Sequence, residues 1–190
     1  MRQEELGDDF YSKNRTAWRG NTIVPIRVTG KALDLGCGNG KTVSALIDEG
    51  FDVTGVDFSE VAINQCKERF PNSEFLVTDV TILPFPDSTF DYVTAVHILE
   101  HLDEEQLSKT VKEIERVLVD GGYVFIRCFT KRDMRSGKRN DSDIFYRFYE
   151  VETILKAFEG FKVESAELKE ETTRFGGLRS RVEVLIKVNK

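Results

Sequence analysis

The sequence contains few of the residues that bind metals or form disulfides. Among 190 residues there are three cysteines and only two histidines. The cysteines, Cys37, Cys66 and Cys128, are odd in number and form no C-x-x-C pair. This usage is typical of a reducing compartment and argues against a secreted fold stapled by disulfides. We therefore expect a cytoplasmic protein without a structural metal.

Long hydrophobic runs are also missing. No stretch approaches the roughly 18 apolar residues that a membrane-spanning helix requires, and the first residues contain no apolar core with a cleavage site. There is no internal repeat and no low-complexity tract. We therefore expect no membrane span.

Positive charge is in deficit, with 27 Lys and Arg against 33 Asp and Glu, a formal net charge of −6. This balance disfavours a protein that coats nucleic acid or anionic lipid through bulk charge, although it permits a local basic site. The length suits one domain. We predict a lead-in or cap over 1–30, a single domain over 31–190, and a monomer or a homodimer.

Strand-like and helix-like segments alternate from Lys31 onward. The pattern predicts a three-layer αβα sandwich with a mostly parallel sheet, because strand–helix–strand connections are right-handed crossovers. Gly121-Gly122 is expected to end the longest helix, and the last two strands to form an antiparallel hairpin at one edge. The predicted strands are 31–35, 51–56, 75–77, 90–96, 123–129, 161–168 and 182–188, and the predicted helices are 41–49, 59–70, 103–118 and 150–158.

A glycine-rich turn, LDLGCGNG, joins the first strand to the first helix of this series. Glycines let the backbone turn sharply and let a ligand approach the main chain, and the helix N-terminus adds free N–H donors. The spacing is G-x-G-x-G, which differs from the G-x-G-x-x-G of dinucleotide enzymes. Asp34 precedes the turn and can accept hydrogen bonds from the loop or, through water, from a ligand ammonium group.

Two more acidic residues follow the next two strands. Asp57 closes the second strand, where a carboxylate can accept hydrogen bonds from both ribose hydroxyls. Asp79 follows the third strand, where it can receive an adenine amino group. Each acid alone could be a solvated loop residue or a helix cap. Together with Asp34 they mark one ligand crevice at the carboxyl ends of the strands.

These segments resemble a known family. ALDLGCGNGKT, VTGVDFS, LVTDVTILPFPDSTFDYVTAVHILEHL and GGYVFI are similar to the ordered motifs of class I S-adenosylmethionine-dependent methyltransferases, most of all the ubiE/type-11 group. The resemblance implies a seven-stranded Rossmann-like sheet of order 3-2-1-4-5-7-6 with an antiparallel last strand. It also implies S-adenosylmethionine as cofactor and S-adenosylhomocysteine as product.

The resemblance further implies a role for individual residues. The turn would hold the methionine part of the cofactor, Asp57 the ribose, and Asp79 the adenine. The full set implied for the cofactor is Asp34, Gly36, Cys37, Gly38, Gly40, Asp57, Phe58, Asp79, Val80, His97 and Ile98.

Both histidines lie in HILEH, which fits the H-x-x-E-H pattern of some zinc proteases. A zinc site would need both inside one helix and a third ligand, whereas His97 falls at a strand exit and no other histidine exists. We therefore predict no metal. His97 could instead accept a proton from the substrate, since its pKa lies near neutrality, and we expect His101 to be structural.

Basic and aromatic residues follow the fifth strand in TKRDMRSGKRNDSDIFYRFYE and recur in TTRFGGLRSR. Such interleaving suits an anionic or aromatic substrate, or a flipped base, but also a solvated loop beside a core-filling helix. A small-molecule acceptor is the first hypothesis. RNA is an alternative, as is a nucleotide-binding protein without methyl transfer. The substrate candidates are Arg132, Arg135, Tyr146 and Arg174, with Arg179 and Arg181 in the second basic segment.

Overall fold

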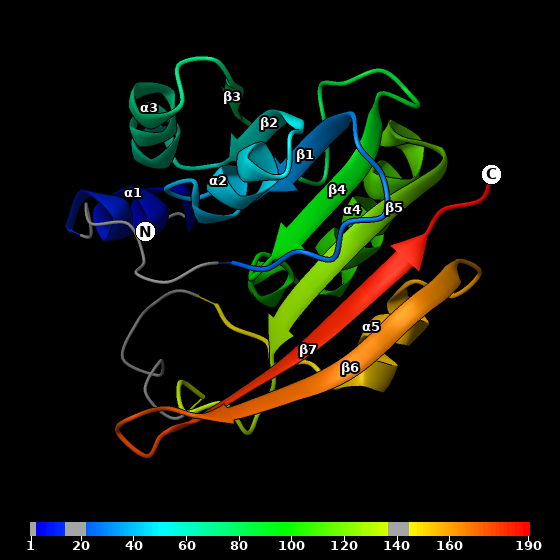
Figure 1. The fold of residues 1–190 in the computed structure, drawn as a ribbon. Coiled ribbons are helices and arrows are strands. Elements are labelled where there is room, and N and C mark those ends of the chain that lie inside the picture. The colour runs from blue at the N-terminus through cyan, green and yellow to red at the C-terminus, as the bar shows by residue number, and fades with distance from the viewer. Residues whose placement is uncertain (1–2, 14–21, 137–144) are drawn as a thin grey trace.

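The computed structural model describes residues 3–13, 22–136 and 145–190. Parts of the predicted lead-in and of the basic loop therefore lie outside the described residues. The chain forms a twisted sheet with helices on both sides (Figure 1). Its elements in chain order are α1 (Gln3–Lys13), β1 (Lys31–Leu35), α2 (Lys41–Asp48), β2 (Asp52–Asp57), α3 (Glu60–Arg69), β3 (Glu74–Val77), β4 (Phe90–Val96), η1 (Leu99–His101), α4 (Glu104–Val117), β5 (Leu118–Phe129), α5 (Val151–Ala157), β6 (Lys162–Thr172) and β7 (Leu178–Lys187).

The sheet has seven strands in the order β3-β2-β1-β4-β5-β7-β6, as the resemblance implied. The first five strands in this order pair in parallel, and β7 pairs antiparallel with both β5 and β6. The predicted edge hairpin is thus confirmed. Because β1, β2, β3 and β4 are parallel, their carboxyl ends lie at the same edge of the sheet.

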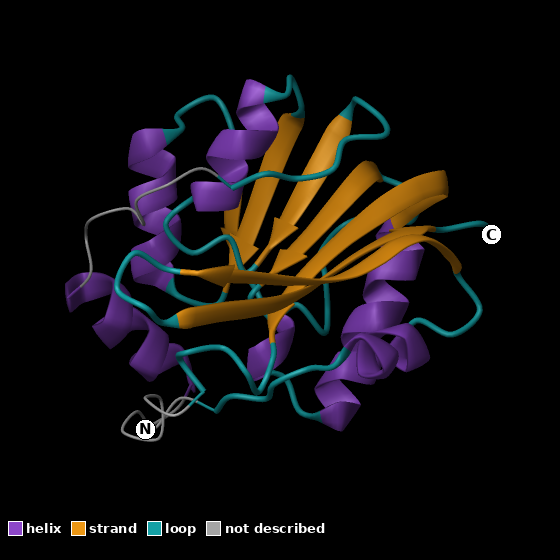
Figure 2. Cartoon of the chain, turned by 60° about the horizontal axis from the view of Figure 1, so that its bottom comes forward, coloured by secondary structure: helices purple, strands orange, loops and turns teal. Residues whose placement is uncertain are grey.

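Two cores fill the space between the sheet and its helices. One contains the apolar stripe of α4 together with Ile154 of α5 and Tyr149. The other contains Val43 and Leu46 of α2 and Ile63 of α3. Figure 2 shows the helices on the two sides of the sheet. The sequence prediction of a three-layer sandwich is therefore confirmed.

Helix boundaries follow from side-chain capping. Ser59 accepts a hydrogen bond from the Ala62 backbone N–H at 3.1 Å and begins α3. Asp103 and Gln106 form a reciprocal capping box at the start of α4. Each cap satisfies N–H groups that a helix leaves unpaired in its first turn. Both helix starts are as predicted from the sequence.

The end of α4 differs from the prediction. The helix ends at Val117, and Leu118 already begins β5, so Gly121-Gly122 lies inside a twelve-residue strand instead of ending the helix. Between the pairs Phe90–Leu118 and Tyr92–Tyr123, four residues of β5 lie opposite one residue of β4, and Gly121 has a φ of 78°. A glycine in a strand commonly marks such a bulge. None of the described helices is long and apolar enough to cross a membrane.

Candidate cofactor and acceptor site

The glycine turn follows β1 directly. Gly36, Gly38 and Gly40 all have positive φ, at 65°, 51° and 84°, a region that side chains rarely adopt. A Cβ at Gly36 would lie 2.8 Å from the Ile98 side chain, and one at Gly38 would lie 2.6 Å from the Tyr11 hydroxyl. The turn therefore requires glycine for its conformation and for the close approach of other groups.

Asp57 ties this turn to the end of β2. Its Oδ2 accepts a hydrogen bond from the Gly38 N–H at 2.9 Å, and its Oδ1 accepts one from the Ser59 N–H at 2.9 Å. The side chain is almost fully buried. Burial raises the pKa of Asp57 to about 6, although the bonds from Ser59 and Gly38 oppose that rise. Each carboxylate oxygen has one N–H donor and can accept a second.

Asp34 lies inside β1 and is also buried. The Thr94 hydroxyl of β4 donates to its Oδ1 at 2.7 Å. Burial raises the pKa of Asp34 to about 7, the Thr94 hydrogen bond opposes this, and the Asp57 charge adds to it. Two acidic groups thus share the same edge of the sheet, and neither forms an ion pair among the described residues.

The predicted adenine contacts lie farther along the same edge. Asp79 is exposed, and its Oδ1 accepts a hydrogen bond from the Thr81 N–H at 2.8 Å, while Val80 is buried. Phe58 follows Asp57 and lies against α1, since a Cβ at Gly7 would come within 2.6 Å of its ring. The structure places these three residues near the ends of β2 and β3.

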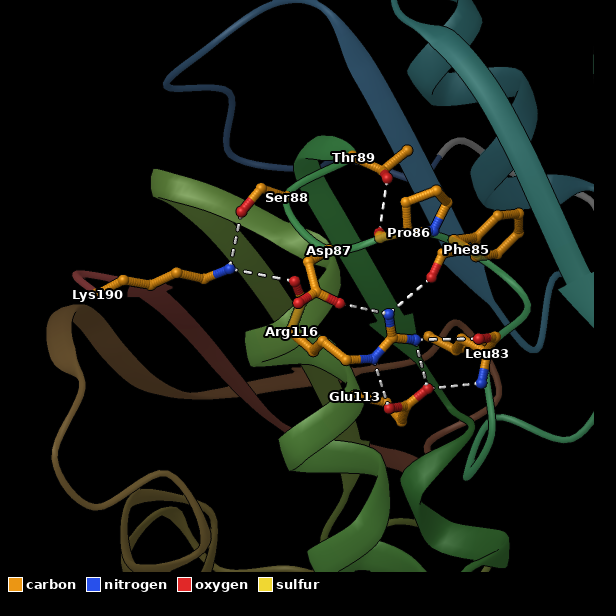
Figure 3. A network of polar contacts seen from close by, with 9 residues as sticks. All are labelled: Leu83, Phe85, Pro86, Asp87, Ser88, Thr89, Glu113, Arg116 and Lys190. Carbon is orange, nitrogen blue, oxygen red and sulfur yellow. Dashed lines mark hydrogen bonds and ion pairs between the residues drawn. The ribbon is translucent and has the colours of Figure 1, made fainter.

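The loop after Asp79 is fastened to α4 by one guanidinium group (Figure 3). Arg116 donates to the carbonyl oxygens of Phe85 at 2.6 Å and Leu83 at 3.0 Å, and pairs with Asp87 at 2.9 Å. Glu113 holds the same guanidinium through two bonds of 2.8 Å and accepts the Leu83 N–H at 2.6 Å. This network fixes the segment that connects Asp79 to β4.

Helix α1 contributes Tyr11 to this site, a residue that the sequence analysis did not single out. Asp8 accepts the Ser59 hydroxyl at 2.6 Å, and Gln65 donates to the Tyr11 carbonyl at 3.2 Å, so α1 packs on α3. The Tyr11 hydroxyl lies beside Gly38. Its pKa is raised by burial and then by the Asp57 charge. Only a tertiary contact places Tyr11 here, and its polar segment carries no periodic signal.

His97 leaves β4 in a left-handed conformation with a φ of 60°. Its Nδ1 lies 2.9 Å from Glu100 Oε1, and its ring stacks on Phe129 with 3.8 Å between centroids. Glu100 is fully buried and also accepts the Phe129 N–H at 2.8 Å. Sequence reasoning noted Glu100 only as part of a zinc pattern, whereas here it orients an imidazole.

The charges of this pair follow from their surroundings. Burial lowers the pKa of His97, although Glu100 opposes the effect. Burial alone would raise the pKa of Glu100, but the bonds from His97 and the Phe129 N–H bring it below its usual range. A carboxylate can only accept, so the neutral imidazole carries its proton on Nδ1. His97 Nε2 is therefore left as a hydrogen-bond acceptor.

The two histidines bind different groups. His101 lies in η1, where its Nδ1 is 3.0 Å from the Phe145 carbonyl oxygen and its ring meets the Tyr146 ring edge-on at 4.5 Å. In the described part of the chain, no group of three or more His, Cys, Asp or Glu side chains could hold a metal ion. Ile98, between them, is buried against Gly36.

The predicted substrate residues are dispersed around this edge. Arg135 lies with its guanidinium carbon 4.5 Å from the centre of the Phe129 ring, which also carries His97. Arg132 pairs with Glu170 at 3.0 Å, and Arg174 lies over Phe175 in the β6–β7 turn. Residues 137–144 of the basic loop lie outside the described residues.

Comparison with known proteins links this geometry to one kind of protein. A family model described as a methyltransferase domain matches residues 33–126, which span the glycine turn and β1 through most of β5. A methyltransferase from Methanosarcina mazei, described as SAM-dependent, has a solved structure with a TM-score of 0.73 and 23% identity. The match covers 84% of this chain and 92% of that one.

The names of similar curated proteins specify different methyl acceptors. The demethylmenaquinone methyltransferase of Lysinibacillus sphaericus is 29% identical over 191 residues, 93% of this chain and 80% of that protein. The mouse eEF1A lysine and N-terminal methyltransferase is 37% identical over 99 residues, half of this chain. The chain spans only 14% of the length of that mouse relative.

Proposed function

The chain belongs to the class I S-adenosylmethionine-dependent methyltransferases, and we propose that it methylates a small-molecule acceptor. The observation that carries the proposal is the arrangement at the strand ends. The glycine turn follows β1, Asp57 ends β2, Asp79 comes after β3, and His97 follows β4. Ligands of open α/β sheets bind at this edge.

S-adenosylmethionine is the cofactor of this family, and the residues at the edge fit it. Three glycines with positive φ leave the turn without side chains of its own, so its backbone N–H groups would bind the methionine part. Asp57 can accept one ribose hydroxyl on each oxygen in addition to its backbone donors. Asp79 is exposed and would accept from the adenine amino group, with Phe58 and Val80 against the ring.

The chemistry asks little of the protein. When bound, the cofactor supplies a methyl group already activated on a sulfonium centre. The chain has to align the acceptor, an effect that can lower a barrier by roughly 7–11 kcal/mol. We propose that His97 removes the acceptor proton, and the contact between its Nδ1 and Glu100, which leaves Nε2 as an acceptor, supports this role.

A small acceptor agrees with the overall charge. A net charge of −6 repels a polyanion, whereas one local cluster of arginines can still bind a small anion. The name of the Lysinibacillus relative specifies a quinone precursor as its acceptor, which supports the same size class. The name of the mouse relative specifies a protein acceptor, but the sequence match to that relative covers only half of this chain.

Transfer of a labelled methyl group distinguishes a small acceptor from RNA. The assay would offer S-adenosylmethionine with small aromatic and anionic acids in one set and total tRNA in another, over a salt series. We expect label in the small-acid set, with a modest salt dependence. Label only in tRNA, falling by orders of magnitude between low and physiological salt, would instead establish the RNA alternative.

A further inference from the structure

A cluster of basic side chains occupies one face of the sheet next to His97. Side chains alternate along a strand, and directly paired residues share a face. Arg127 lies opposite Glu183, and Phe129 lies opposite Arg181, in the β5–β7 pairing. Arg179 is two residues from Arg181 and shares that face. Phe125, two residues before Arg127, is buried in the core beneath α2 and α3, which identifies the face.

Lys41 and Arg135 complete this basic cluster from outside the strands. Lys41 begins α2, directly after the glycine turn, and Arg135 lies against Phe129 at 4.5 Å. The pKa of Lys41 is lowered by burial and then by the charges of Arg127, Arg179, Arg181 and Arg135. Lys41 is therefore near enough to these four arginines, from three other segments, for their charges to act on it.

The carboxylates around this basic cluster do not neutralise it. Glu183 is shared between Arg127 and Lys169, at 2.8 Å each. A single Glu171 oxygen serves both Arg179, at 3.4 Å, and Arg181, at 3.3 Å. Asp133 lies 3.5 Å from Arg135. Lys169 also pairs with Glu167 at 3.7 Å, so with both included six cations face four carboxylates, in a chain that is acidic overall.

Two guanidinium groups also retain unused donors. The Nε atoms of Arg179 and Arg181 are buried, and neither has a hydrogen-bond partner among the described residues. A buried donor without a partner costs free energy, which a hydrogen bond to a ligand would offset. The Nε and Nη edge of arginine matches the two oxygens of a carboxylate or phosphate. The arrangement therefore favours an anionic ligand.

We propose that Lys41, Arg135, Arg179 and Arg181 bind the anionic group, a carboxylate or a phosphate, of the methyl acceptor. The proposal rests on the function proposed above. Phe129 links the two sites, because its ring contacts both Arg135 and the imidazole of His97. An acceptor held by its anionic group at the basic cluster would thus extend its reacting atom toward His97.

Anion binding can be measured before the acceptor is known. The protein, saturated with S-adenosylhomocysteine, would be titrated with inorganic phosphate and separately with benzoate at constant ionic strength. Thermal unfolding reports binding, because a ligand of the native state raises the unfolding temperature. Phosphate stands for a phosphate group on the acceptor and benzoate for a carboxylate. The probe that binds more tightly identifies which of the two groups the acceptor carries.

The test variant is Arg179→Gln/Arg181→Gln, with Arg181→Gln as a milder substitute if the double variant unfolds. The control is Arg27→Gln, which removes one positive charge from an exposed arginine whose Nη1 bonds only to the neighbouring Ile26 carbonyl among the described contacts, and which matches the single variant Arg181→Gln in charge. We expect the wild type and the control to bind one probe at millimolar concentration. The double variant should bind it at least tenfold more weakly.

Three other outcomes would overturn the proposal. Equal binding by the double variant and the control would mean that these arginines hold no anion. Loss of S-adenosylhomocysteine affinity in the double variant would assign the basic cluster to the cofactor carboxylate instead. No response of the wild type to either probe would remove the anion site while leaving methyl transfer intact. Failure of the wild type to bind S-adenosylhomocysteine would count against the proposed function itself.

Discussion

At the scale of single residues, two features suit His97 to accept a proton. Its Nδ1 proton is held by Glu100, and its pKa is lowered by burial. Glu100 acts only through His97 and is a positioning residue. The imidazole would be neutral near pH 7 and ready to accept a proton on Nε2.

Replacing His97 tests this role. His97→Asn keeps a side chain that tolerates positive φ but cannot take up a proton. We expect the turnover number to fall roughly 10²- to 10⁴-fold, the usual contribution of a general base, with cofactor affinity changed only a few-fold. His101→Asn is the control, as its ring contacts Tyr146 instead of Glu100. Equal turnover in the two variants would exclude His97 as the base.

Asp34 gives the protein a measurable dependence of stability on pH. Its folded pKa is about 7, above the usual 3.8, so the folded state binds the proton more tightly than the unfolded chain. The stability from this group is fully present below the unfolded pKa and is lost as pH rises through about 7. Between about pH 5 and about pH 8.5 that loss is roughly 2–3 kcal/mol.

The variant Asp34→Asn isolates this contribution. Urea unfolding of the cofactor-free protein should show the wild type losing more stability than the variant as pH rises over this range. His97 has the opposite trend, since its lowered pKa favours folding at higher pH, but it is common to both proteins. Parallel pH curves for the two proteins would show that Asp34 has an ordinary pKa.

At the scale of elements, the loop between β3 and β4 depends on α4 for its shape. Arg116→Gln removes hydrogen bonds to two loop carbonyls and the ion pairs with Glu113 and Asp87. We expect the free energy of unfolding to fall by roughly 1.5–3 kcal/mol, because these are charge-assisted bonds at a partly buried group. Lys112→Gln, on an exposed position of the same helix, should change it by less than about 0.5 kcal/mol.

The result of Arg116→Gln also bears on the cofactor. Because this network fixes the segment after Asp79, affinity for S-adenosylhomocysteine should fall a few-fold while the glycine turn is unchanged. Chemical unfolding and cofactor titration of the same preparations give both values. Stability equal to that of Lys112→Gln would mean that the loop holds its conformation without the guanidinium.

The sequence predicted elements well where the signal is local. Ser59 and Asp103 mark helix starts through their own side-chain bonds, and the alternation of segments defines the sheet order once the family is known. The prediction was wrong at Gly121-Gly122, because glycine pairs occur at helix ends and in bulges alike. The last strand likewise begins at Leu178, four residues earlier than predicted.

The sequence did not predict the contacts that join distant segments. Tyr11 reaches Gly38 only because α1 packs on α3, and Glu100 reaches the Phe129 N–H only because β4 and β5 are neighbours. The basic cluster likewise joins Lys41 to residues of β5 and β7. Contacts of this kind depend on the three-dimensional arrangement and leave no periodic pattern. The roles given to the individual cofactor residues remain predictions.

At the scale of the whole molecule, charge is divided unequally. The chain has a net charge of −6, yet one face beside the strand ends carries more cations than carboxylates. Acidic groups lie deeper at the same edge, where Asp34 and Asp57 are buried behind the glycine turn. A cationic cofactor and an anionic acceptor would each meet the charge that attracts them.

Calorimetric titration with S-adenosylhomocysteine, with NAD as a parallel ligand, tests the central claim most directly. We predict a dissociation constant on the order of micromolar for S-adenosylhomocysteine and no binding of NAD. Asp57→Ala should weaken the binding by roughly 1.5–3 kcal/mol, about 10- to 150-fold, whereas Asp52→Ala, at the other end of β2, should not change it. Binding of NAD alone, of neither ligand, or equally by folded Asp57→Ala would contradict the account.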